Sequence, residues 1–143
     1  MADPAPVQNP LSAVLTLKAG AKLDSVQHPF TAPGSTSDPH ILHFLWVISL
    51  AALGAPTKIM VTTVYDGDFD AYLDAFIDAD PEKFNALLPL LQGAPPPPIT
   101  NPANRAAFHT YIRDNNIPPL PGTFFSAYPT MTVIKILRCQ QKP

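Results

Sequence analysis

The chain has 143 residues, 46% of them hydrophobic and 14% charged, with a formal net charge of −2 at neutral pH. This length suffices for one domain with a hydrophobic core of its own. No basic cluster suggests a nucleic-acid or anionic-membrane surface, and the longest apolar stretch, residues 41–53, is too short for a transmembrane helix.

The start of the chain and its cysteine content bear on the compartment. The first residues, MADPAPVQNP, contain neither the basic nor the apolar region of a secretory signal, so we expect a cytoplasmic protein. Cys139 is the only cysteine, which excludes an internal disulfide and a multi-cysteine zinc site. We expect a flexible N-terminal segment (residues 1–11), one domain with proline-rich insertions (residues 12–138) and a C-terminal tail (residues 139–143).

Proline is concentrated in a few segments. The chain has 19 prolines, clustered in residues 1–10, in residues 29–39, in the run Pro95–Pro98 and in the sequence NNIPPLPG. Because proline fixes φ and lacks an amide hydrogen, these clusters predict loops and insertions. The run Pro95–Pro98 predicts a short polyproline II spacer, with a ligand for a proline-binding domain as the alternative.

Several segments have the composition of β-strands. Residues 12–20 alternate in polarity and end in glycine. Residues 40–50 are almost continuously apolar, which predicts a strand in the centre of a sheet. Residues 58–65 predict a strand antiparallel to it across a short connection, and residues 123–128 predict a further strand. Residues 131–137 either continue that last strand or form a closing helix.

The segment VTTVYDGDFDAYLDAFI, from Val61 to Ile77, predicts a strand that leads into a helix. From Phe69 onward its apolar residues fall on one helical stripe. Asp66 or Asp68 is placed to cap this helix, and the later aspartates, four residues apart, suit a solvated face. The spacing of acids from Asp66 also resembles the start of an EF-hand calcium loop. The glycine and glutamate that such a loop requires are replaced by Ala71 and Ile77. We therefore predict a helix start and no metal site.

Two more helices follow from their start signals. Asp80 with Pro81 and Asn101 with Pro102 each combine a capping side chain with proline at the first helical position. Residues 21–30 have room for a short helix at most. This order of elements predicts an α+β fold, a ferredoxin-like antiparallel sheet with helices on one face.

The stretches LTLKAG, HFLWVISL, KIMVTTVYDGDFDAYLDAFI, FHTYIRDNNIP and TFFSAYPTMTVIKI resemble, in this order, a group of bacterial proteins related to the dimeric α+β barrel superfamily. The resemblance covers most of residues 12–138, and its HF and YDGDFDAYLDAFI pieces are the most specific. It implies that the free sheet face meets a second copy or lines a cavity for an apolar small molecule. A homodimer and a hydrophobic ligand are therefore expected. Dye-decolourising haem peroxidases and antibiotic-biosynthesis monooxygenases are distantly similar.

His43 is the strongest candidate for chemistry, because an imidazole within an apolar strand is desolvated and needs a partner. It suits a general base or an axial haem ligand. The alternative is a structural histidine hydrogen-bonded to the turn at Asp66 or to a tyrosine. Tyr65 and Asp66 complete the catalytic candidates, since a phenol and a carboxylate at a strand end can orient a substrate or tune His43. Their alternative roles are a core tyrosine and a turn residue before Gly67.

The residues expected to contact a ligand on the sheet face are Phe44, Trp46, Thr63 and Tyr128. Strict alternation along the strand places Phe44 and Trp46 on one face together with Leu42, and His43 on the other. For Trp46, packing in the core or in a dimer is the alternative.

Three classes of function fit these residues. The favoured one is a small-molecule enzyme or binding protein with an apolar pocket on the sheet face, with cyclase-, isomerase- or oxygenase-like chemistry on a hydrophobic metabolite. The alternatives are a haem-binding protein that uses His43 or His109, and a non-catalytic structural or self-association module. Haem-peroxidase activity is disfavoured because Thr63 replaces a glycine of the distal motif, and no cofactor other than haem is suggested. No nucleophile elbow or phosphate-binding loop is present, which argues against hydrolases and nucleotide enzymes.

Overall fold

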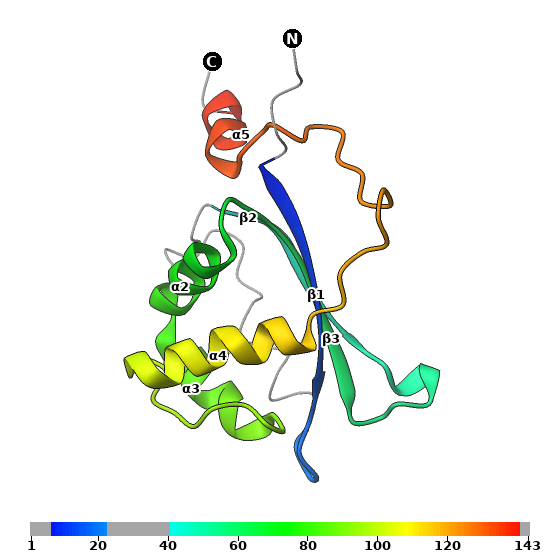
Figure 1. Ribbon diagram of the computed structural model, residues 1–143, viewed down its shortest axis with the longest axis vertical. Coiled ribbons are helices and arrows are strands. Elements are labelled where there is room, and N and C mark those ends of the chain that lie inside the picture. The colour runs from blue at the N-terminus through cyan, green and yellow to red at the C-terminus, as the bar shows by residue number, and fades with distance from the viewer. Residues whose placement is uncertain (1–6, 23–40, 141–143) are drawn as a thin grey trace.

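A computed structural model describes residues 7–22 and 41–140 of the chain (Figure 1). Three strands form one antiparallel sheet in the order β1-β3-β2. Their bounds are β1 (Gln8–Thr16), β2 (Leu42–Ser49) and β3 (Lys58–Asp66). The expected α+β class is confirmed, since this sheet is combined with α-helices.

Three helices cover one face of the sheet, and a fourth lies at the end where β1 begins (Figure 1). The covering helices are α2 (Phe69–Ala79), α3 (Pro81–Leu87) and α4 (Pro102–Asn115), and the last is α5 (Val133–Gln140). Short 3₁₀ helices, η2 (Ala51–Leu53) and η3 (Leu88–Leu90), lie in the β2–β3 connection and directly after α3. The short helix considered for residues 21–30 falls largely outside the described residues.

Two predictions about the strands are wrong and one boundary moves. The strand β2 lies at the edge of the sheet, and β3 is the central strand. The apolar composition of β2 suggested a central strand. The helices cover only one face of β2, and hydrophobic side chains on its other face are partly exposed. The first strand begins at Gln8 rather than Ser12.

The fourth strand expected at residues 123–128 is absent; the segment is loop, and α5 follows it. Prolines flank it at residues 118, 119, 121 and 129, and they remove amide donors that a strand ladder needs. Of the two expectations for residues 131–137, the closing helix is confirmed. The order β1-β3-β2 places β3 between two mutually parallel strands, and the ferredoxin-like arrangement stays a prediction.

The helix starts agree with their predicted capping residues. The carboxylate of Asp68 accepts hydrogen bonds from the amides of Asp70 and Ala71 at the start of α2. Asp80 and Asn101 cap α3 and α4 in the same way. Because capping depends on residues within one turn, the local sequence sufficed to predict it.

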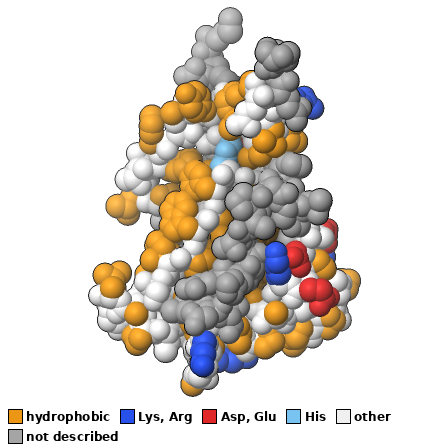
Figure 2. Space-filling view, turned by 180° about the vertical axis from the view of Figure 1, so that it is seen from behind, with side chains coloured by type: hydrophobic (Ala, Val, Ile, Leu, Met, Phe, Trp, Pro, Cys, Tyr) orange, Lys and Arg blue, Asp and Glu red, His pale blue; other side chains and the backbone are white. Residues whose placement is uncertain are grey.

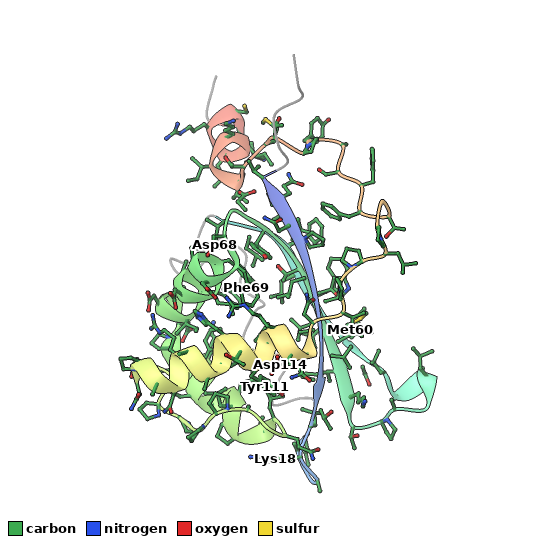
Figure 3. The ribbon with its side chains drawn as sticks, in the orientation of Figure 1. Lys18, Met60, Asp68, Phe69, Tyr111 and Asp114 are labelled. Atoms are coloured by element: carbon green, nitrogen blue, oxygen red, sulfur yellow. The ribbon has the colours of Figure 1, made fainter. Side chains whose placement is uncertain are left out.

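The hydrophobic core lies between the sheet and helices α2, α3 and α4. On β1 and β3 the odd-numbered residues face the helices, as shown by the nearly complete burial of Ala13, Ile59 and Thr63. The even-numbered residues of β3 face the opposite side; Figure 3 shows Met60 pointing away from the helices. We call this second side the outer face.

Candidate functional site

His43 lies in a β-bulge at the start of β2. The pairing with β3 shifts there, so that Leu42 lies opposite Tyr65 and Phe44 lies opposite Val64. A bulge inserts an extra residue and redirects its side chain. Leu42 consequently shares the helix side with Tyr65, and the strict alternation expected along β2 is wrong at this point.

Asp66 holds the ring of His43. Nε2 of His43 lies 2.8 Å from Oδ1 of Asp66, while Oδ2 of Asp66 accepts the amide hydrogen of Val133 at 2.7 Å. The two side chains are only 10% and 9% exposed. Asp66 thus joins β2, β3 and the first residue of α5, and the hydrogen bond considered for His43 with the Asp66 turn is present.

This contact defines which nitrogen of His43 is available. An ionised carboxylate only accepts hydrogen bonds, so Nε2 of His43 must donate to Asp66. In a neutral imidazole the other nitrogen, Nδ1, then carries the lone pair. No described residue gives Nδ1 a hydrogen-bond partner. The arrangement can accept a proton or bind a donor at Nδ1.

Tyr65 and Thr63 belong to the opposite, helix-covered side. Tyr65 is 6% exposed and its ring stacks on that of Tyr72, with centroids 4.3 Å apart. Burial raises the pKa of Tyr65. Thr63 is fully buried, and the hydroxyl of Tyr72 lies 3.5 Å from its Oγ1. The structure therefore separates these two candidates from the ring of His43, which reaches Asp66 on the outer face.

Phe44 and Trp46 lie together on the outer face. Their rings stack with centroids 5.2 Å apart, and the side chains are 48% and 44% exposed. Ile48 continues the row and is 38% exposed, with Met60 of β3 opposite it. We call these four residues the outer patch. Figure 2, a view from behind, shows hydrophobic side chains running along this part of the surface.

A hydroxyl beside the outer patch was not anticipated. Thr62 lies between Trp46 of β2 and Ser12 of β1 in the sheet register. Its Oγ1 is buried and has no hydrogen-bond partner within the described part of the chain. Thr63, the residue expected from the sequence, lies on the helix side instead; alternation counted from the Asp66 end of β3 would have favoured Thr62.

Gln8 anchors the loop before α5 across the outer face. Its Nε2 donates to the carbonyls of Tyr128 and Met131 at 3.0 and 2.9 Å, and Ser126 Oγ donates to its Oε1 at 2.7 Å. Tyr128 itself is 68% exposed in this loop, not on a strand as expected. Gln8 escaped prediction because it was assigned to the flexible N-terminal segment. Among the described residues, the outer face is thus covered at this end, while the side chains of the outer patch are partly exposed.

A small apolar cavity lies on the helix side of the sheet. Its volume is about 50 Å³. Typical residues of its lining are Leu11, Leu15, Val47, Tyr72, Phe76 and Ile112. Pockets for drug-sized ligands measure about 300–1,000 Å³. This cavity is therefore too small for the expected metabolite, so a site for it would have to lie on the outer face.

His109 is held between two carboxylates of α2. Its Nδ1 lies 3.0 Å from Asp70 and its Nε2 lies 3.1 Å from Asp74. The second contact has the distance of an ion pair without the alignment of a hydrogen bond. Arg113 also pairs with Asp70, and its hydrogen bond holds the pKa of that carboxyl below the ordinary value. Asp70 and Asp74 of α2 thus face α4, and each ring nitrogen of His109 lies close to one of these carboxylates.

Within residues 7–22 and 41–140, no group of three or more His, Cys, Asp or Glu side chains is arranged to hold a metal ion. No helix there is long and apolar enough to cross a membrane.

Compared with known proteins, the chain matches no family model, no curated protein sequence and no solved structure. The resemblance to dimeric α+β barrel proteins therefore stays a hypothesis.

Proposed function

We propose that this protein binds a hydrophobic small molecule on the outer face of its sheet. Phe44 and Trp46 supply the apolar contact surface, and His43 supplies the polar group. The observation that carries the proposal is the position of these half-exposed, stacked rings directly after a histidine that a buried carboxylate orients. Ligand sites combine an apolar lining with a few oriented polar groups in this way.

The same residues support proton transfer to a bound metabolite. With Nε2 donating to Asp66, Nδ1 of His43 can take a proton, and the carboxylate stabilises the imidazolium that forms. A basic group that abstracts a proton beside an apolar surface suits isomerase- or cyclase-like chemistry. The hydroxyl of Thr62, which has no hydrogen-bond partner among the described residues, supplies a second polar contact. In this scheme Asp66 positions His43, and Tyr65 and Thr63 serve the core.

An open patch leaves one side of a ligand in water. The homodimer expected from the sequence would reduce this exposure if the second copy lay beside the outer patch and extended the apolar surface that the ligand contacts. A second copy of this chain is therefore part of the proposal. We also propose that the protein acts in the cytoplasm.

Haem binding is the second candidate, and one observation favours it. Histidines that ligate metals usually donate their other ring N–H to a carboxylate or carbonyl, as His43 does to Asp66. His109 does not suit this role because both of its ring nitrogens face carboxylates. A haem group would supply redox chemistry when bound.

The test uses Trp46 as a reporter, since it is the only tryptophan of the chain. We expect 2-naphthol and naphthalene to quench or shift its fluorescence on binding, because both are flat and apolar. His43→Gln should weaken 2-naphthol at least about tenfold, the loss of about one hydrogen bond, and leave naphthalene unchanged. Phe44→Ala should weaken both ligands.

Leu53→Ala is the matched control, because Leu53 is 81% exposed in η2, outside the outer patch. An unchanged Trp46 signal with both probes, or equal losses in Phe44→Ala and Leu53→Ala, would contradict the proposal. Addition of haemin to the same protein tests the second candidate. A Soret band that disappears in His43→Gln would favour haem binding over a metabolite site.

A further inference from the structure

The strand β2 has one edge with which no described residue pairs. Leu50 directly follows β2, and its N–H donates to the carbonyl of Lys58. The peptide groups of Leu50 therefore point toward β3. Because this direction alternates along an antiparallel strand, residues 44, 46 and 48 also face β3. The peptide groups of Leu45, Val47 and Ser49 point the other way. Among the described residues none hydrogen-bonds to them.

The opposite edge of the sheet, along β1, is protected. Pro10 has no amide hydrogen to offer there. Ser12 N–H donates to Asn116 Oδ1 at 3.0 Å, and the Ser12 carbonyl accepts from Ile117 at 2.8 Å. Farther along, the carbonyl of Thr16 accepts from Gln92 at 2.8 Å. Side chains and loops thus satisfy this edge without a strand.

The edge of β2 has few such devices. Residues 41–57 contain no Asp, Glu, Lys or Arg, and proline first occurs at Pro56. The bulge at His43 disturbs only the first residues of the strand. A regular, apolar edge without charge is a template for pairing with another strand.

We propose that β2 pairs antiparallel with β2 of a second copy of this chain, about a two-fold axis at Val47. In this register Val47 lies opposite Val47 of the second copy, and Leu45 lies opposite its Ser49. All three residues have outward-facing peptide groups, so each opposed pair exchanges two hydrogen bonds. Strand addition of this kind is an established mode of recognition, and the two-fold contact is self-complementary.

The second copy is favoured as the occupant because the side chains also match. In the same register Trp46 lies opposite Ile48 of the second copy on the outer face, and the two outer patches become one continuous apolar surface across the axis. The inference goes beyond the proposed ligand site and does not depend on it.

The buried area predicts a weak dimer. A fully exposed aromatic side chain contributes about 150–250 Å², so Phe44 and Trp46, at 48% and 44% exposure, each offer roughly 100 Å². With Ile48 and the strand edge the contact buries on the order of several hundred Å² per chain. This is less than the roughly 800 Å² per partner of a standard interface, so the dimer should dissociate on dilution.

The first experiment compares Ser49→Pro with Ser49→Ala by sedimentation velocity over about a hundredfold range of protein concentration. Both variants remove the hydroxyl that lies 3.3 Å from the amide of Ala51, but only proline removes the outward amide hydrogen. We expect the wild-type chain and Ser49→Ala to dimerise alike, and Ser49→Pro to raise the dissociation constant at least about tenfold.

The second experiment tests the register directly. Trp46→Cys and Ile48→Cys are made separately, each with Cys139→Ser. Opposed residues of a non-hydrogen-bonded antiparallel pair have Cα atoms about 4.5 Å apart, within the range for a disulfide. Under mild oxidation the mixture of the two variants should form a disulfide-linked dimer at least about ten times faster than either variant alone. This result decides the proposal even where circular dichroism shows Ser49→Pro to be unfolded.

A chain that stays monomeric at every concentration would overturn the proposal. So would a dimer that Ser49→Pro leaves unchanged, or rapid cross-linking of Trp46→Cys with itself, which indicates sheets packed face to face. The ligand titration on monomeric Ser49→Pro, whose outer patch is intact, shows independently whether the small-molecule site exists.

Discussion

The two faces of the sheet bury their side chains by different means. The helix side is filled by apolar and aromatic residues that are almost inaccessible to solvent, such as Ile59, Tyr72 and Ile77. On the outer face, hydrogen bonds that Gln8 donates and Asp66 accepts hold the C-terminal segment over one end of the sheet. Among the described residues, the outer patch beside it is apolar and partly exposed. Because the helix side buries most of the apolar surface, it should supply most of the stability, and recognition on the outer face stays a proposal.

The sharpest test of this difference is a matched pair of cavity-creating variants. Ile77→Ala, on the helix side, should lower the free energy of unfolding by about 2–5 kcal/mol, because Ile77 is fully buried. Ile48→Ala, on the outer face, should cost less than about 1 kcal/mol, because Ile48 already contacts solvent. Urea unfolding of both variants measures the two values. Equal losses would show that the open appearance of the outer face is misleading.

A second test uses the buried phenol of Tyr72. Burial raises its pKa from the ordinary 10.0 to about 12. The unfolded chain loses this proton near pH 10, so the contribution to stability is complete below pH 10 and disappears as pH rises to about 12. A shift of this size corresponds to about 3 kcal/mol.

Tyr72→Phe removes this titration, so its free energy of unfolding should fall less steeply between these pH values than that of the wild type. Tyr128→Phe, which changes an exposed tyrosine, should leave the steep fall in place. Parallel pH profiles for the wild type and Tyr72→Phe would refute the assignment of the alkaline transition to Tyr72.

The polar anchor of the outer face should matter less for overall stability and more for α5. Asp66→Ala leaves His43 and the amide of Val133 without their partner, which should cost about 1–3 kcal/mol. Hydrogen exchange should accelerate first in α5. Asp78→Ala, which changes a 62% exposed carboxylate on α2, should leave exchange in α5 unchanged. Protection of α5 that survives in Asp66→Ala would mean that apolar contacts alone hold the helix.

The smallest effect is expected at the α2–α4 contact. The hydrogen bond from Arg113, with the nearby charge of His109, lowers the pKa of Asp70 below its ordinary 3.8. A depressed acid pKa stabilises the fold above pH 3.8, and the contribution is lost as pH falls through the lower native value. Thermal unfolding of Asp70→Asn should therefore depend less on pH in this acidic range. Asp114→Asn serves as the control, and identical profiles for Asp70→Asn and wild type would contradict the coupling.

Local features of the fold could be predicted from the sequence, but the order of the strands in the sheet could not. The capping roles of Asp68, Asp80 and Asn101 and the antiparallel β2–β3 pair follow from residues close in sequence. The edge position of β2 and the loss of the fourth strand depend on which segments meet across the chain. An apolar strand has the same sequence pattern whether it lies in the centre of a sheet or at an edge with one exposed face.

The candidate site divides in the same manner. The sequence singled out His43, Asp66, Phe44 and Trp46 from residue type, position on the predicted strands and the resemblance, and the structure places all of them on or at the end of the outer face. It assigned Thr63 where Thr62 lies, and it passed over Gln8. These errors share one origin, since the face to which a strand residue belongs depends on register, and a single bulge shifts it.

The amino-acid sequence by itself determined the class of the fold, the helix starts and the chemical types that a site can use, because these depend on composition and on short-range hydrogen bonds. Only the tertiary structure decided that His43 is oriented by Asp66, that Asp66 also caps α5, and that the outer patch stays uncovered among the described residues. These contacts join residues distant in the chain. Whether such residues meet is decided when the whole chain buries its apolar surface.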